Sequence, residues 1–193
     1  MVQTAPRRHL TERQAEAVDH LVAATALEVA ACGYDALSMR GIARRAGVAP
    51  ATAYTYFSSK DHALGELLLR RVLDVPEPAV DPDTPVADRL GRVVDGLGAI
   101  TAGDPEVVAA CTQALLSSHP DVKRLRDRIG LEVARRVATA AERPIDDRLV
   151  RVVVTTYFGS LLMAGMGHMP YPEVPTFVAD ATRLMTGTDG TGR

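Results

Sequence analysis

The sequence predicts an all-α protein, and three observations support this. Its 193 residues are 47% hydrophobic and 24% charged, the ordinary balance of a globular chain. Apolar residues recur at three- and four-residue spacings in most segments, as in amphipathic helices, and no segment alternates convincingly like a strand. Capping residues, prolines and glycines separate these segments. We therefore expect about nine helices, in an N-terminal three-helix unit followed by a C-terminal helical unit.

The first helix is expected to begin at Thr11, which forms a capping box with Gln14. Its apolar positions keep a period of 3.6 residues, and it should end near Gly33, because glycine readily terminates a helix. Residues 1–9 precede it and contain two arginines. These fit a basic arm that reaches phosphates or the minor groove, and they fit equally well a tail that contacts nothing.

A helix-turn-helix is predicted at about 38–57, within the segment SMRGIARRAGVAPATAYTYFSSK that runs from Ser38 to Lys60. Gly47 supplies the tight turn, where a Cβ atom would crowd the chain. Pro50 opens the second helix at a position where a missing N–H costs nothing. Two short helices joined in this way are typical of proteins that insert the second helix into the major groove of DNA.

At these residues the sequence resembles the tetracycline-repressor (TetR) family of bacterial transcriptional regulators, whose pattern is T-x-x-x-I-A-x-x-A-G-V-S-x-G-x-x-Y-x-Y-F-x-x-K. The resemblance covers about a quarter of the chain, residues 27–73. Ala49 replaces the usual serine, so we expect a recognition helix without a capping side chain. Ala51 replaces the usual glycine and adds a methyl group close to DNA. The matching residues are Ser38, Ile42, Ala43, Ala46, Gly47, Val48, Thr52, Tyr54, Tyr56, Phe57 and Lys60.

The residues expected to contact DNA are mostly short. The hydroxyl of Ser38 can meet a phosphate, with Arg40 beside it, whereas Arg44 and Arg45 fit a salt-bridged role as well as a DNA contact. Lys60 looks like a phosphate clamp, and the resemblance implies phosphate contacts for the two tyrosines. The chain has no asparagine, so specificity should depend on thymine methyls, arginine and DNA shape. The candidate DNA-binding residues are Ser38, Arg40, Pro50, Ala51, Thr52, Tyr54, Thr55, Tyr56 and Lys60.

The fourth helix, 60–73, can be capped by Ser58 or Ser59 and links the helix-turn-helix to the rest of the chain. The loop DVPEPAVDPD follows it, with three prolines and four acidic residues in ten. Such a loop is a natural boundary between domains. We therefore expect a DNA-binding domain at 1–73, with net charge +2 over the first 72 residues, and a ligand-binding and dimerisation domain at 84–187.

Three further helices should start at Thr84-Pro85, Asp104-Pro105 and His119-Pro120, because each pair joins a capping residue to a proline. The first of them contains three glycines. Each glycine weakens a helix by about 1 kcal/mol relative to alanine. We therefore expect that another group gains from the space left by the missing side chains. These glycines are Gly91, Gly96 and Gly98.

The helix at about 147–168, which Asp146 can cap, is apolar on nearly every side. The chain has too few other helices to cover it, so a second copy of the chain is implied. We expect a homodimer formed by this helix and the last one, at about 173–186. The run carries Arg151 and His168 without flanking membrane anchors, which favours a buried helix over a membrane span.

The family resemblance implies a ligand pocket enclosed by helices of the second domain. The three glycines would provide room, and a few weakly polar groups lie among apolar side chains. For any one of these residues, an ordinary place in the core is the better interpretation. No buried cluster of charges is evident, which favours a hydrophobic small-molecule effector over a polyanion. The candidate lining residues are Leu97, Thr101, Cys111, Leu115, Tyr157 and Phe158.

Motifs of catalysis and metal binding are missing from the sequence. It has no phosphate-binding loop, no zinc-binding H-E-x-x-H and no G-x-S-x-G, and its five histidines are scattered. We therefore expect no catalytic residue, no metal site and no cofactor. Cys32 and Cys111 lack disulfide or metal-ligand patterns, and the N-terminus has no apolar signal segment, which fits a protein of the reducing cytoplasm.

These features together predict a ligand-responsive regulator of transcription, with a repressor as the first expectation. Two reading helices of a dimer must lie on successive major-groove faces, about 34 Å or a small multiple apart, so the double-stranded operator should be palindromic. Two alternatives stay open. One is a DNA-binding dimer that needs no effector, and the other is an enzyme with its site in a helical bundle.

Overall fold

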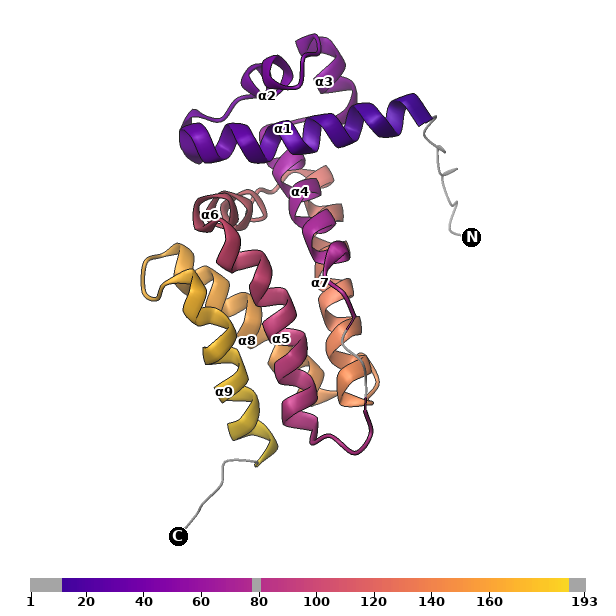
Figure 1. The fold of residues 1–193 in the computed structure, drawn as a ribbon, viewed down its shortest axis with the longest axis vertical. Helices are drawn as coiled ribbons and strands as arrows, with labels where there is room; N and C mark the ends of the chain where they lie inside the picture. The colour runs from indigo at the N-terminus through magenta and orange to yellow at the C-terminus, as the bar shows by residue number, and fades with distance from the viewer. Residues whose placement is uncertain (1–11, 78–80, 188–193) are drawn as a thin grey trace.

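The computed structural model describes residues 12–77 and 81–187, and this part of the chain contains nine α-helices, one short 3₁₀ helix and no strand (Figure 1). The all-α prediction is therefore confirmed. The elements are α1 (Glu12–Ala36), α2 (Met39–Arg45), α3 (Pro50–Tyr56), α4 (Lys60–Asp74), α5 (Val86–Gly103), α6 (Pro105–Ala114), α7 (Pro120–Ala141), α8 (Arg148–Gly165), η1 (Tyr171–Glu173) and α9 (Val174–Thr186).

The helices form two groups along the longest axis of the molecule (Figure 1). At one end, α2 and α3 lie across α1. At the other, α5, α7, α8 and α9 run roughly along the axis as a bundle. Helix α4 leads from the first group into the second, and α6 lies between them. Helix α3 is thus linked to the bundle through one continuous helix, α4.

Two clusters of buried apolar residues hold these groups together. The first is built on α1 to α4, and the second on the end of α4 with α5, α7, α8 and α9. Helix α6 contributes to both, because Val108 lies in the second cluster while its other buried side chains lie in the first. The α6 residues of the first cluster are Val107, Ala110, Cys111 and Ala114. The N-terminal core is therefore completed by a helix that follows the proline-rich loop.

Most predicted helix ends are observed. Gly33 adopts φ 73°, outside helical values, where α1 was expected to end. The side chain of Ser59 caps α4 and that of Asp104 caps α6. The prediction for α8 was wrong by one residue, because Asp147 caps it by accepting the N–H of Leu149 at 2.8 Å. Thr11 lies outside the described residues.

The segment after α4 is held by charged side chains of α7. Arg136 is 4% exposed and donates to the carbonyl oxygen of Val75 at 2.7 Å. It also donates to Glu132 at 2.7 Å. Hydrogen bonds from Arg135 and from Arg136 lower the pKa of Glu132 to about 2. The segment that directly follows α4 is thus fixed to the bundle.

The glycines of α5 do not serve one purpose. A Cβ atom on Gly98 would lie 2.2 Å from Cγ of Pro175, and one on Gly96 would lie 3.1 Å from Val75. A Cβ atom on Gly91 would meet nothing within 4 Å. The expectation that these glycines make room for a ligand is wrong for Gly98, because α9 occupies that space. Pro175 lies in the first turn of α9, where proline is tolerated.

This difference predicts opposite effects for two alanine substitutions in one helix. Gly98→Ala should lower the free energy of unfolding by about 1–3 kcal/mol, because the rigid proline ring cannot move aside without shifting α9. Gly91→Ala should raise it by about 0.5–1 kcal/mol through helix propensity. Urea unfolding followed by circular dichroism measures both. Equal changes in the two variants would contradict the close contact between α5 and α9.

Candidate functional site

The position of α2 against α1 depends on one nearly buried carboxylate. Glu28, 8% exposed, accepts hydrogen bonds from Arg45 Nε at 2.6 Å and Arg44 Nη2 at 3.2 Å. A Cβ atom on Gly41 would lie 2.5 Å from Glu28 Oε1, so this glycine permits the close approach. Arg44 and Arg45 are therefore ion-paired with α1. Sequence reasoning missed Glu28, because nothing local marks a partner 16 residues away.

Helix α3 presents one exposed side and one buried side. Ala53 and Phe57 are buried in the first core. Tyr54 is 54% exposed, whereas Tyr56 is half-buried against the core. Thr55 Oγ1 donates to a carbonyl oxygen of its own helix at 3.0 Å, which leaves its methyl group and an acceptor for other contacts. The exposed residues of this side are Pro50, Ala51, Thr52, Tyr54 and Thr55.

Ser38 and Arg40 lie at the start of α2, and both are exposed. Ser38 Oγ accepts the N–H of Gly41 at 3.1 Å and so caps the helix. Its hydroxyl hydrogen stays free to donate to an anion. Arg40 makes no hydrogen bond or ion pair within the described residues. Both groups can therefore meet a phosphate without breaking an existing contact.

Lys60 is already engaged at the start of α4. Its Nζ donates to the carbonyl oxygen of Tyr34 at 2.7 Å and lies 4.1 Å from the centre of that ring. The hydroxyl of Tyr34 donates to Asp61 at 2.7 Å. Burial, followed by this hydrogen bond, raises the pKa of Tyr34 to about 12. An ammonium group has three donors, so Lys60 retains two for a phosphate while it joins α4 to the end of α1.

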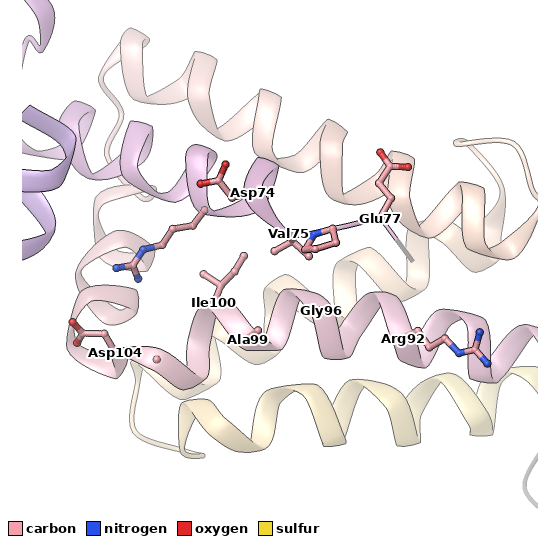
Figure 2. A pocket seen from close by; sticks show the side chains of 11 residues that line it. Asp74, Val75, Glu77, Arg92, Gly96, Ala99, Ile100 and Asp104 are labelled. Atoms are coloured by element: carbon pink, nitrogen blue, oxygen red, sulfur yellow. The ribbon is translucent and has the colours of Figure 1, made fainter. Parts of the chain in front are cut away.

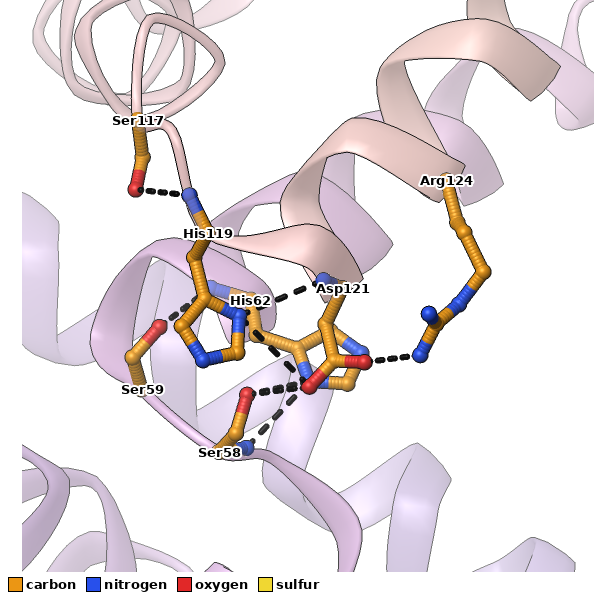
Figure 3. Close-up of polar contacts among 7 residues, drawn as sticks. All are labelled: Ser58, Ser59, His62, Ser117, His119, Asp121 and Arg124. Carbon is orange, nitrogen blue, oxygen red and sulfur yellow. Dashed lines mark hydrogen bonds and ion pairs between the residues drawn. The ribbon is translucent and has the colours of Figure 1, made fainter.

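A polar cluster joins the corner between α3 and α4 to the start of α7 (Figure 3). Ser58 Oγ donates to Asp121 Oδ2 at 2.7 Å, and the N–H of Ser58 donates to His62 Nδ1 at 3.2 Å. Arg124 forms an ion pair with Asp121 on the other side. Burial lowers the pKa of His62, although Asp121 opposes this shift. Sequence reasoning missed this cluster, because 63 residues separate its two halves.

The second group of helices contains a small apolar cavity of about 280 Å³ between α4, α6, α7 and α8. Leu115 and Phe158, two of the residues expected to contact a ligand, line it. The guanidinium of Arg126 is its one charged group and donates to the carbonyl oxygens of Leu115 at 2.6 Å and Ser117 at 3.3 Å. The lining residues are Leu68, Thr112, Leu115, Leu116, Arg126, Gly130, Phe158, Leu161 and Leu162.

The other residues expected to contact a ligand lie elsewhere. Leu97 and Tyr157 are buried in the second core, and burial raises the pKa of Tyr157. Cys111 belongs to the first core, where its thiol lies 3.5 Å from the carbonyl oxygen of Leu64 and burial raises its pKa to about 12. The side chain of Thr101 lies outside the described residues.

A larger, open groove of about 730 Å³ lies between α4 and α5. Figure 2 shows Asp74 at the end of α4, across the groove from Ile100 and Ala99 on α5, with Arg92 farther along α5 and directed away from them. Its rim mixes both signs of charge, because Asp74, Glu77, Asp104, Arg71 and Arg92 all belong to it. This groove resembles ordinary solvated surface more closely than an enclosed ligand site.

Two further features bear on the chemistry of the chain. Within the described residues, no group of three or more histidine, cysteine, aspartate or glutamate side chains could hold a metal ion. Among the same residues, no helix combines the length and apolar character needed to cross a bilayer.

Comparison with known proteins identifies relatives over nearly the whole chain. Residues 21–67 match the model described as bacterial regulatory proteins, tetR family. An uncharacterised HTH-type transcriptional regulator of Mycobacterium tuberculosis strain H37Rv is 38% identical over 183 residues, covering 89% of this chain and 85% of that protein. The HTH-type transcriptional repressor KstR of the same strain is 30% identical over 185 residues, covering 92% and 84%.

The fold has solved counterparts. The crystal structure of a TetR transcriptional regulator from Rhodococcus sp. RHA1 superposes with a TM-score of 0.73 at 19% identity. The superposition covers 93% of this chain and 99% of that one. The arrangement of both helix groups is therefore shared with that protein.

Helix α3 lacks a capping side chain, as its sequence predicts, because Ala49 at the N-cap makes no side-chain hydrogen bond. Ala49→Ser should supply one and raise the free energy of unfolding by about 1 kcal/mol. Urea unfolding measures the change. As a control, Ala99→Ser on the exposed surface inside α5 should give no gain, because no unpaired N–H awaits a cap there. Equal stabilisation by both changes would contradict the capping argument.

Proposed function

This chain belongs to the tetR family of bacterial regulatory proteins, ligand-responsive transcriptional regulators that bind DNA, and on that premise we propose that it is a homodimeric repressor. It binds a palindromic operator in the cytoplasm, performs no catalysis and is released by a largely apolar small molecule. The observation that carries the proposal is the joining, through α4, of the exposed side of α3 to a partly open apolar cavity. Repression is further supported by the similarity to KstR, which is named a repressor.

The proposed reading surface is the exposed side of α3. It offers methyl groups from Ala51 and Thr55, which suit the C5-methyl of thymine in the major groove. Ser38 and Arg40 at α2, together with Lys60 at α4, surround it and would contact phosphates. With no amide side chain in this surface, DNA shape contributes much of the specificity.

The proposed dimer interface lies on α8 and α9. Val152 and Met163 are exposed along α8, Met166 directly after it, and Phe177 and Leu184 along α9. A monomer that leaves this many large apolar side chains in water on two neighbouring helices is costly, and a second copy would cover them. The proposal keeps the helices at about 147–168 and 173–186 that the sequence predicts for the interface.

The proposed effector site is the cavity between α4, α6, α7 and α8. Its volume of about 280 Å³ is at the low end for ligand pockets, so the effector is small or widens the cavity on binding. Leucine and phenylalanine side chains dominate its wall, which suits an apolar molecule. Release from DNA requires that this molecule bind the DNA-free conformation more tightly than the DNA-bound one.

Lys60 provides a test of the phosphate contacts. Replacing it with glutamine should weaken DNA binding to specific and non-specific duplexes alike, and should reduce the slope of log K against log salt by about one unit. Fluorescence anisotropy at several salt concentrations measures the slope. Weaker binding with an unchanged slope would contradict the phosphate contact and would mean that Lys60 acts only by joining α4 to α1.

The function is tested by selecting duplexes from a random DNA library with the purified protein. The expected result is a palindromic sequence bound by two chains, with half-sites about 34 Å or a multiple apart. Small apolar molecules extracted from the protein and identified by mass spectrometry should then release this duplex. Selection of a palindrome without release by any extracted or screened apolar molecule would leave a DNA-binding dimer without an effector.

Matched variants separate the dimer from general surface effects. Leu184→Glu on α9 should yield a monomer by light scattering and lose binding to the palindrome, because a charge would enter the proposed interface. Leu131→Glu on α7 is the control, since Leu131 is 63% exposed and Leu184 70%. A dimer that survives Leu184→Glu unchanged would contradict the assigned interface.

A further inference from the structure

The corner between α3 and α4 receives a direct contact from the second domain. Ser58 lies two residues after the last residue of α3 and two before the first residue of α4. Its hydroxyl donates to Asp121 Oδ2 at 2.7 Å, and Asp121 stands in the first turn of α7 (Figure 3). A carboxylate of one domain thus holds the end of the recognition helix in the other.

The serine is fixed from its own side. Its N–H donates to His62 Nδ1 at 3.2 Å. The imidazole ring of His62 stands edge-on to Phe57, with ring centres 5.3 Å apart and an interplanar angle of 87°. Phe57 is itself buried in the first core. These contacts connect Ser58 to His62 and Phe57, so the position of the Ser58 hydroxyl depends on the backbone that follows α3.

The carboxylate is fixed from the opposite side. The N–H of Asp121 donates to His119 Nδ1 at 3.2 Å, and Arg124 forms an ion pair with the carboxylate. His62 Nδ1 lies 3.8 Å from Asp121 Oδ2. The hydrogen bond from Ser58 is the first cause of a lowered pKa at Asp121, so the group is ionised at neutral pH. An ionised acceptor makes the contact stronger than a neutral one.

The same part of α7 borders the apolar cavity. Arg126, five residues after Asp121, lines that cavity and holds the loop before α7 through the carbonyl oxygen of Leu115. Leu115 is also a lining residue. A molecule that widens the cavity would therefore press on the loop and on the first two turns of α7, which carry Asp121.

From this geometry we propose that Asp121 is a positioning residue: by holding Ser58 it sets the direction of α3, and it transmits a displacement of the start of α7 to the DNA-reading surface. The proposal rests on the proposed function, because it explains how an occupied cavity reaches DNA. It assigns no DNA contact and no ligand contact to Asp121. Its effect is on the angle between domains.

The native cysteines allow a test on the free protein. Cys32 is exposed near the end of α1, whereas Cys111 is buried against Leu64, so a nitroxide reagent should label Cys32 selectively. Pulsed electron paramagnetic resonance then measures the distance between the two DNA-binding domains of a dimer. The variants are Ser58→Ala, Asp121→Ala and the double variant. Asp127→Ala is the control, because Asp127 is exposed on α7 and pairs only with Lys123 among the described residues.

We expect the distance distribution to broaden in Ser58→Ala and Asp121→Ala, and to broaden no further in the double variant, because both changes break one contact. Affinity for the selected duplex should fall about fivefold in each single variant and by no more than about twofold further in the double variant. Asp127→Ala should behave as the unmodified protein. Urea unfolding of each variant separates loss of stability from loss of orientation.

An unchanged distribution in Ser58→Ala, or equal broadening in Asp127→Ala, would overturn the proposal. If light scattering shows that the sample is monomeric, the proposed dimer is contradicted and the contact is tested by hydrogen exchange, which also serves where no distance is obtained. In that case faster amide exchange at residues 54–62 in Ser58→Ala and Asp121→Ala supports the proposal. Unchanged exchange there refutes it.

Discussion

The burial of one face of α6 in the N-terminal core is the constraint on which the rest of the structure depends. Val107, Ala110, Cys111 and Ala114 complete a cluster otherwise built from α1 to α4, while Val108 of the same helix packs into the bundle. Removing α6 would expose apolar surface of both cores. The two groups of helices are therefore packed together through α6. A displacement within the bundle would act through α6 on the core that supports α2 and α3.

Carboxylates at helix junctions refine this coupling. Glu28 holds α2 against α1, Glu132 organises the arginines that fix the loop after α4, and Asp121 holds the end of α3. Each accepts hydrogen bonds from two or more groups, so few charges remain unpaired where helices meet. The apolar clusters supply most of the driving force for folding. The carboxylates connect the helices where they meet, and under our proposal the contact of Asp121 sets how two α3 helices would be presented to DNA.

The proposed reading surface on α3 and the proposed effector cavity lie in different groups of helices. Helix α3 presents short exposed side chains and is followed by the buried Phe57, so in the proposed complex small shifts of its backbone would change which groups reach a base. The cavity lies beside α4 and α7, the two helices whose starts contact the corner after α3. This proximity explains why an apolar molecule of modest size could influence DNA binding without approaching DNA.

The sequence by itself determined the helices and the helix-turn-helix, because capping residues, prolines and apolar spacing act within a few residues. It also predicted that Pro50 opens α3 and that Ala49 leaves this helix without a capping side chain. Only the tertiary structure decided that α6 completes the N-terminal core, that Pro175 fills the space beside Gly98 and that Leu115 and Phe158 meet in one cavity while Cys111 lies elsewhere. These outcomes depend on contacts between residues far apart in the chain, such as Ser58 and Asp121, and no local pattern specifies which surfaces meet.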